Sequence, residues 1–178
     1  MKILAIDSSG LVATVALLDQ DILVGEYTIH NKKTHSQTLL PMIDAMLSMA
    51  EVPVEELDAL AVSAGPGSFT GLRIGASTAK GLAQGLDIPI VAVPTLEGLA
   101  YNLQGADSVV CAMMDARRNQ TYTGLYSFDG NEMEVLKEQC AVGIDEIISI
   151  VNQFEQPVTF LGDGVPVFQE YIAENCSV

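Results

Sequence analysis

The chain has 178 residues, of which 49% are apolar and 17% charged, so it can form one large domain or two small ones with a sizeable core. Eight Lys and Arg against 23 Asp and Glu give a net charge of -15, which excludes a protein that holds nucleic acid or anionic membranes by its own basic surface. Its three cysteines, Cys111, Cys140 and Cys176, lack metal-type spacing and favour a reducing compartment.

Three strands are predicted at the start of the chain, over residues 2–7, 11–18 and 22–29. The turns between them are short, so we expect an antiparallel meander. The first apolar run is too short for a signal peptide, and no apolar run approaches the roughly 20 residues of a membrane span. We therefore expect a cytoplasmic protein that does not enter a membrane.

The next predicted element is a helix over residues 35–50, with Thr34 or Ser36 as its N-cap. Its apolar residues cover more of the helix surface than one core contact requires. We therefore expect a second packing surface for a partner, and ordinary core packing is the alternative. The candidate partner contacts on this helix are Leu39, Ile43 and Met46.

A glycine-rich segment, GPGSFTGLRIG at residues 65–75, joins a predicted strand over 57–62 to a predicted helix over 70–85. A strand that runs through glycines into a helix presents backbone N–H groups, which bind phosphate, so Gly67 and Ser68 are candidate phosphate contacts. A tight connection that binds nothing is the alternative interpretation.

The helix over 70–85 has Gly71, Gly75, Ala79 and Ala83 at four-residue spacing. This spacing leaves one helix face almost without side chains, so another helix can approach it closely. The bare face is predicted to meet either a partner or the protein's own sheet.

The second half of the chain repeats the order of the first. A strand over 88–93 and a helix over 95–101 end the first half, and a link follows at 104–107. The second half then has three strands, a helix, a strand and a glycine turn into a helix, predicted at 109–115, 120–128, 132–140, 144–154, 158–161 and 162–171. A repeated βββαβα order predicts an α/β fold of two similar lobes, residues 1–103 and 104–178.

Four segments in order carry a resemblance: ILAIDSS at 3–9, HSQTLLP at 35–41, GPGSFTGLRIG at 65–75 and MDAR at 114–117. The duplicated unit resembles the ribonuclease H-like fold of the actin, hexokinase and sugar-kinase superfamily (ASKHA). With these segments, the chain resembles the bacterial TsaB (YeaZ) family. That family is related to TsaD, the transferase that installs threonylcarbamoyl on the adenosine next to the tRNA anticodon.

The resemblance implies a protein that is not an enzyme. TsaD holds a metal with a His-x-x-x-His pair, whereas here His35 stands alone and Leu39 occupies the second position, so we assign no metal and no catalytic residue. The first hairpin residues Asp7, Ser8 and Ser9 are candidate contacts for a nucleotide phosphate. The basic residue that kinases use there is absent, so we expect no required cofactor and only weak ATP or ADP binding.

The resemblance also implies partners. Family members act as a scaffold that binds TsaD through the helices at 35–50 and 70–85, with the ATPase TsaE as a third subunit. Alone they form homodimers through the same helices, and they meet tRNA only indirectly. Gly71, Gly75 and Ala79 are then candidate interface residues, and Arg73 either contacts a partner carboxylate or is a solvated charge.

One departure and two alternatives accompany this interpretation. TsaB proteins continue beyond the element that ends at Val178, so we expect a truncated second lobe that lacks a helix on one face. The alternative functions are an ASKHA-type ATPase or kinase and an M22-type glycoprotease. The missing second histidine and the absence of a Ser-His-Asp or Cys-His pattern disfavour the peptidase.

Overall fold

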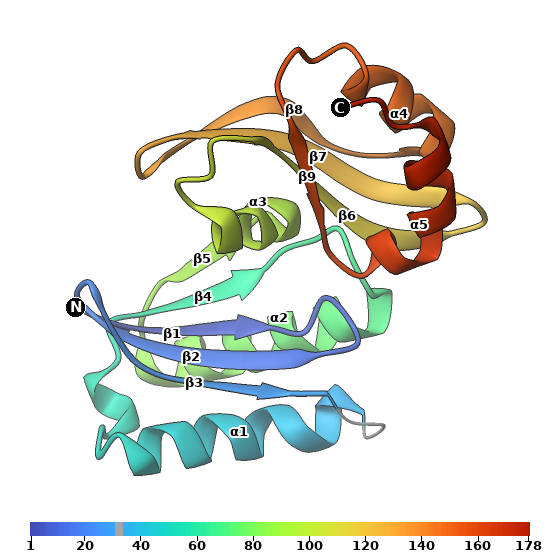
Figure 1. Ribbon diagram of the computed structural model, residues 1–178. Coiled ribbons are helices and arrows are strands. Elements are labelled where there is room, and N and C mark those ends of the chain that lie inside the picture. The colour runs from blue at the N-terminus through green and yellow to red at the C-terminus, as the bar shows by residue number, and fades with distance from the viewer. Residues whose placement is uncertain (31–33) are drawn as a thin grey trace. The chain divides into compact units, whose positions relative to one another are not determined.

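The computed structural model describes residues 1–30 and 34–178, which form two compact units, Met1–Pro94 and Thr95–Val178 (Figure 1). The division falls before helix α3 (Thr95–Ala100), whereas the sequence placed it between residues 103 and 104. The reason is packing, since Leu96 and Ala100 of α3 are fully buried against the second sheet. Each unit is described below by itself.

The first unit is built on a five-stranded mixed sheet in the order β3-β2-β1-β4-β5. Its strands are β1 (Lys2–Asp7), β2 (Ala13–Asp19), β3 (Ile22–Ile29), β4 (Ala59–Ser63) and β5 (Ile90–Val93). The first three form the predicted antiparallel meander, and β4 then pairs with β1 in parallel. The crossovers between these strands contain helices α1 (His35–Met49) and α2 (Phe69–Leu86) and the short 3₁₀ turn η1 (Val54–Glu56).

The core of the first unit lies between this sheet and helices α1 and α2 (Figure 1). Leu4 and Ile6 of β1 alternate with less buried residues, as expected for a strand with one face toward the core. From the helices, Leu39, Ile43 and Met46 of α1 and Ala79 of α2 join the same core. Both helices are therefore held by apolar burial against one sheet.

The second unit repeats the topology in the order β8-β7-β6-β9. Its strands are β6 (Val109–Arg117), β7 (Gln120–Asp129), β8 (Glu132–Gly143) and β9 (Val158–Leu161), and β9 pairs with β6 in parallel as β4 does with β1. Its helices are α3 with the 3₁₀ turn η2 (Tyr101–Leu103), α4 (Ile144–Val151) and α5 (Gly164–Asn175). The predicted duplicated α/β fold is confirmed.

Both faces of the second sheet carry a packed cluster. Ile147 of α4 and Phe168 of α5 pack against one face with Cys111 and Met113, while Leu96 of α3 packs against the other face. The expectation that one face lacks a helix is wrong, because α3 belongs to this unit and fills that place.

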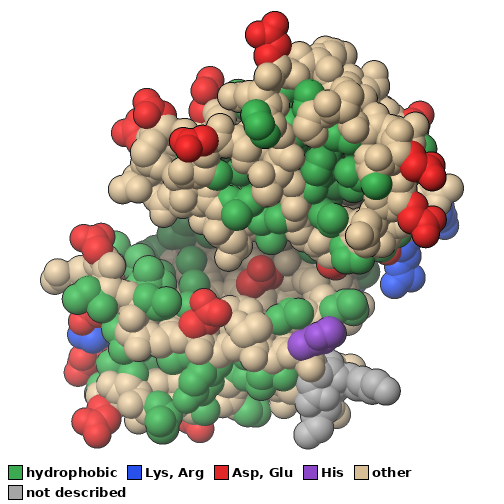
Figure 2. Space-filling model, viewed as in Figure 1, with side chains coloured by type: hydrophobic (Ala, Val, Ile, Leu, Met, Phe, Trp, Pro, Cys, Tyr) green, Lys and Arg blue, Asp and Glu red, His purple; other side chains and the backbone are tan. Residues whose placement is uncertain are grey.

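The surface shown in Figure 2 carries acidic side chains on both units and few basic ones, as the net charge of -15 requires. Within the described ranges, no helix is long and apolar enough to cross a membrane.

Candidate functional site

The turn after β1 and the glycine turn before α2 lie against each other. The backbone N–H of Ser68 donates to the carbonyl oxygen of Ser9 (2.6 Å), and the Ser8 hydroxyl donates to the carbonyl oxygen of Gly71 (2.9 Å). Ser8 and Ser9 are 2% and 3% exposed. The Asp7 carboxylate accepts the N–H of Ser9 (2.8 Å), which closes the turn after the strand.

Glycine is needed on α2 because this turn approaches the helix so closely. A Cβ at Gly71 would collide with the carbonyl oxygen of Ser8, and one at Gly75 would lie 2.5 Å from the Ser8 hydroxyl oxygen. Ser68 is the N-cap of α2 and accepts the N–H of Gly71 (3.2 Å). The bare face of α2 therefore meets the unit's own first hairpin.

The second unit uses the same arrangement. The Asp115 carboxylate accepts the N–H of Arg117 (2.8 Å), two residues further on, just as Asp7 accepts from Ser9. A Cβ at Gly162, in the turn before α5, would collide with the carbonyl oxygen of Met113. In both units, a glycine in or beside the glycine turn thus lies against a carbonyl oxygen at or just after the end of the first strand or within it. The shared contact indicates that these glycines are needed for packing within each unit.

The five predicted phosphate contacts, Asp7, Ser8, Ser9, Gly67 and Ser68, do come together in the first unit. Their hydrogen bonds, however, run largely among themselves and to Gly71: the Ser8 hydroxyl, the Ser9 carbonyl and the Ser68 N–H all have protein partners. Phosphate binding at these residues and weak ATP or ADP binding stay predictions.

His35 lies at the start of α1 and its Nε2 is 2.9 Å from the carbonyl oxygen of Gly10, to which it donates. This hydrogen bond ties the start of α1 to the turn after β1. Among the described residues, no group of three or more His, Cys, Asp or Glu side chains is placed to hold a metal ion.

The predicted interface residues separate into two groups. Leu39, Ile43, Met46 and Ala79 are 1 to 3% exposed in the core of the first unit, and Gly71 and Gly75 are buried against Ser8. These six residues are packed within the first unit, which favours the alternative of core packing, and their contact with a partner stays a prediction. Arg73 alone of the set is exposed.

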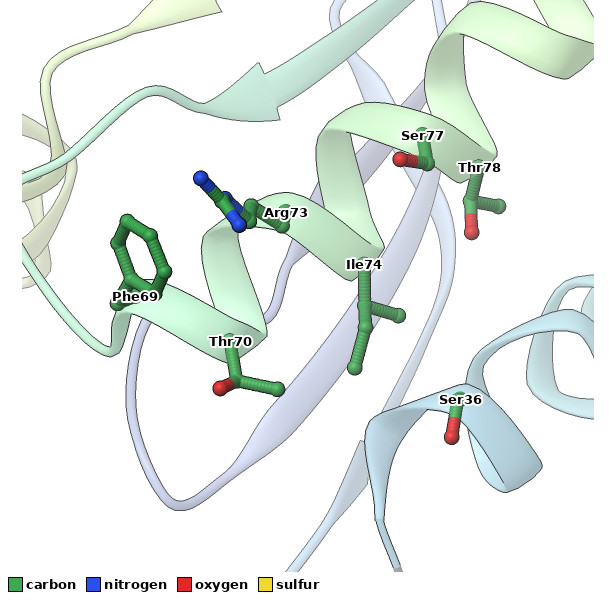
Figure 3. Close-up of a pocket in the computed structure, with 7 residues that line it drawn as sticks. All are labelled: Ser36, Phe69, Thr70, Arg73, Ile74, Ser77 and Thr78. Atoms are coloured by element: carbon green, nitrogen blue, oxygen red, sulfur yellow. The ribbon is translucent and has the colours of Figure 1, made fainter.

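An open groove of about 450 Å³ lies along α2 and reaches the start of α1 (Figure 3). Four hydroxyl-bearing residues line it: Ser36 of α1 and Thr70, Ser77 and Thr78 of α2. Phe69, Arg73 and Ile74 complete the lining. In Figure 3, Thr70 and Ile74 point from α2 toward Ser36, while Phe69 and Arg73 lie on the other side of the helix.

The Arg73 guanidinium carbon lies 3.8 Å from the centroid of the Phe69 ring, and Phe69 is 68% exposed. Further large apolar side chains are exposed on α1, namely Leu40 (55%) and Met49 (77%). The sequence patterns did not single out Phe69, Leu40 and Met49 as exposed apolar residues. For α2, the sequence does contain a pattern that indicates a second face. Phe69, Arg73 and Ser77 follow one another at four-residue spacing, on a face other than that of the buried glycines.

In the second unit, the pKa values of two side chains are shifted by their surroundings. Burial raises the pKa of the Cys111 thiol to about 12. Burial also raises the pKa of Tyr126, whose hydroxyl has no hydrogen-bond partner among the described residues. Both shifts favour the neutral form and therefore give neither residue a reactive anion at neutral pH.

Comparison with known proteins gives consistent results. A family model described as TsaD, tRNA N6-adenosine threonylcarbamoyltransferase, matches residues 23–177. The tRNA threonylcarbamoyladenosine biosynthesis protein TsaB of Bacillus subtilis is 37% identical over 174 residues, which are 98% of this chain and 76% of that protein. TsaB of Haemophilus influenzae is 41% identical over 128 residues, 68% of this chain and 52% of that protein.

A solved structure of YeaZ from Pseudomonas aeruginosa superposes with a TM-score of 0.78 at 30% sequence identity. The match covers 99% of this chain and 80% of that one. The chain thus spans about half to four fifths of the length of these relatives.

Proposed function

The chain belongs to the TsaB family, and from this premise we propose that it acts in the biosynthesis of tRNA threonylcarbamoyladenosine as a non-catalytic subunit that binds and activates TsaD. The names of the relatives support the pathway. The binding of TsaD, the participation of TsaE and a homodimer in the absence of both are parts of the proposal.

The observation that carries the proposal is the exposed apolar surface of α1 and α2. Leu40 and Met49 of α1 and Phe69 of α2 are each more than half exposed, although other residues of both helices are buried in one core. Large apolar side chains that stay exposed on a helix can contribute to a protein–protein interface. We propose that the exposed sides of these two helices meet TsaD.

The charge of the chain fits a subunit that leaves tRNA to others. The chain has 23 acidic residues against eight basic ones, so its net negative charge repels a polyanion such as tRNA. We therefore propose that TsaD holds the tRNA and that this chain contacts tRNA only indirectly. We also propose that the chain acts in the cytoplasm.

Isothermal titration of TsaD with this chain tests the proposal. We expect a saturable one-to-one complex, and we expect Leu40→Asp and Met49→Asp to weaken it at least tenfold, because each places a charge in an apolar contact. Val167→Asp on α5 is the matched control, since Val167 is 57% exposed on the second unit. Absence of binding by the unaltered chain would overturn the proposal.

Cells depleted of the chain give the functional readout. We expect threonylcarbamoyladenosine to disappear from their tRNA, as measured by mass spectrometry of nucleosides, and to return when the unaltered chain is expressed. Unchanged levels in depleted cells would contradict a role in this modification.

Two assays address the alternative functions. Calorimetric titration with ATP and Mg²⁺ is expected to show no tight site, and strong heat with turnover would favour an ASKHA ATPase or kinase. Casein is expected to stay intact with the metal-supplemented chain, whereas its cleavage would favour a peptidase.

A further inference from the structure

The hairpin turn between β6 and β7 in the second unit carries two of the eight basic residues of the chain, Arg117 and Arg118. Both are exposed, and neither lies within ion-pair distance of a carboxylate in the described part of the chain. The carboxylates of Asp115 and Asp163 instead hold the backbone: Asp115 accepts the N–H of Arg117 (2.8 Å), and Asp163 accepts the N–H of Asp115 (3.3 Å). Two guanidinium groups therefore stay in solvent on a protein with 23 acidic residues.

The backbone of this turn is unfavourable for arginine. Arg117, Arg118 and Asn119 have φ angles of 63°, 54° and 58°, in the left-handed region that glycine and asparagine adopt more readily than other residues. A two-residue hairpin turn with positive φ at both residues, as at Arg118 and Asn119, favours Asn-Gly or Asp-Gly. Formation of the hairpin thus does not explain an arginine at position 118. Backbone conformations of this kind concentrate at binding sites.

The corresponding turn of the first unit is packed instead of exposed. In each unit, an Asp carboxylate accepts the N–H of the residue two positions further on. In the first unit that residue is Ser9, which is 3% exposed and lies against Gly67. In the second unit it is the exposed Arg117, and Gly162 lies against Met113, four residues earlier in the chain. The same turn therefore serves packing in one unit and presents cations to solvent in the other.

We propose that the β6–β7 turn binds an acidic segment of a protein partner, whose carboxylates pair with the guanidinium groups of Arg117 and Arg118. A planar guanidinium binds a carboxylate through two parallel hydrogen bonds. Two adjacent guanidinium groups therefore suit a segment with neighbouring Asp or Glu residues. This surface goes beyond the proposed function, because it belongs to the second unit, whereas α1 and α2 of the first unit are proposed to meet TsaD.

Charge identifies a protein rather than a nucleic acid as the occupant. At physiological salt the field of a charge decays over about 8 Å, so the two arginines act only close to the turn. A nucleic acid extends its phosphates well beyond that distance, along a chain with a net charge of -15. A protein can instead carry carboxylates at the contact and neutral or basic side chains around it.

Nuclear magnetic resonance of the isotope-labelled full chain at low salt tests the proposal, with a tetraglutamate peptide blocked at both ends as the probe. We expect saturable shifts of the backbone N–H signals of Arg117, Arg118 and Asn119. Arg117→Ala and Arg118→Ala should each weaken binding about threefold and together about tenfold, as is usual for exposed ion pairs. Lys137→Ala removes the same charge from β8 of the same unit and should leave the affinity unchanged within about a factor of two.

Arg118→Asn separates a role in binding from a role in the turn. Asparagine is favoured where φ is positive in a hairpin turn, so the thermal midpoint of this variant should equal or exceed that of the unaltered chain. Its affinity for tetraglutamate should nevertheless fall about threefold, because the guanidinium is lost. A lowered midpoint with unchanged affinity would show that Arg118 serves the hairpin, and the proposal would be overturned.

The other results decide as well. A tetraglutamine peptide that shifts the same signals equally would mean that charge plays no part, which refutes the pairing. If inorganic phosphate or tRNA binds these residues more tightly than tetraglutamate does, the turn serves a phosphate ligand and the proposal is overturned. No saturable shift with tetraglutamate refutes it directly. None of these measurements involves TsaD, so their failure leaves the proposed function standing.

Discussion

The glycines of α2 offer a direct test of how this helix is held, because they occupy two different environments. Gly71 faces the Ser8 carbonyl oxygen, with which an added Cβ would collide. Gly81 is exposed, and a Cβ there would meet nothing within 4 Å. Gly71→Ala and Gly81→Ala are thus the same substitution in one helix, with opposite consequences.

The expected magnitudes follow from three terms. Alanine favours a helix interior over glycine by about 1 kcal/mol, and Gly81→Ala gains most of this. Gly71→Ala must displace backbone, which costs about 1–3 kcal/mol or more, and it disturbs the Ser8 hydrogen bond to Gly71, worth about 1 kcal/mol. We expect Gly71→Ala to be about 2 kcal/mol less stable than the unaltered chain, and Gly81→Ala up to about 1 kcal/mol more stable.

Thermal unfolding followed by circular dichroism measures both effects. The midpoint should rise by about 2–4 °C for Gly81→Ala and fall by more than that for Gly71→Ala. If the two units unfold in separate transitions, the transition of the first unit is the one that shifts. A Gly71→Ala midpoint equal to or above that of the unaltered chain would refute the close approach of α2 to Ser8.

Three further predictions concern buried or hydrogen-bonded side chains. Folding raises the pKa of the Cys111 thiol from 9.0 to about 12, so the unfolded chain loses the thiol proton at a lower pH than the folded chain. Between pH 9 and 12 the contribution of Cys111 to the free energy of unfolding therefore falls by about 1.4 kcal/mol per pH unit. Urea unfolding at pH 7 and pH 10.5 should show a shallower loss in Cys111→Ala, and equal losses would contradict the burial argument. Tyr126→Phe removes a buried hydroxyl without a described partner, so its urea midpoint should equal or exceed that of the unaltered chain. His35→Ala removes the hydrogen bond to the Gly10 carbonyl and should lower stability by about 1 kcal/mol in the same assay; no change would mean that the bond contributes nothing.

The sequence by itself determined the elements and their duplication. Strand β3 (Ile22–Ile29) and strand β9 (Val158–Leu161) have the predicted bounds, because alternation of apolar residues and turn residues are local signals. The Ser68 cap of α2 is likewise a local feature, since capping depends on residues within one helical turn. The boundary between the two units could not be predicted from local signals. Helix α3 belongs to the second unit because Leu96 is buried against the second sheet.

Only the tertiary structure decided which face of α2 is free. The helix has two ridges at four-residue spacing, one through Gly71, Gly75 and Ala79 and one through Phe69, Arg73 and Gly81, and small residues in either ridge permit close approach. The sequence pointed to the first ridge as a docking face. Ser8, 63 residues away from Gly71 in the chain, occupies that ridge, and no pattern within the helix records a contact with so distant a residue. The physical reason is that helix periodicity fixes which residues share a face, whereas burial depends on what the rest of the chain brings against it.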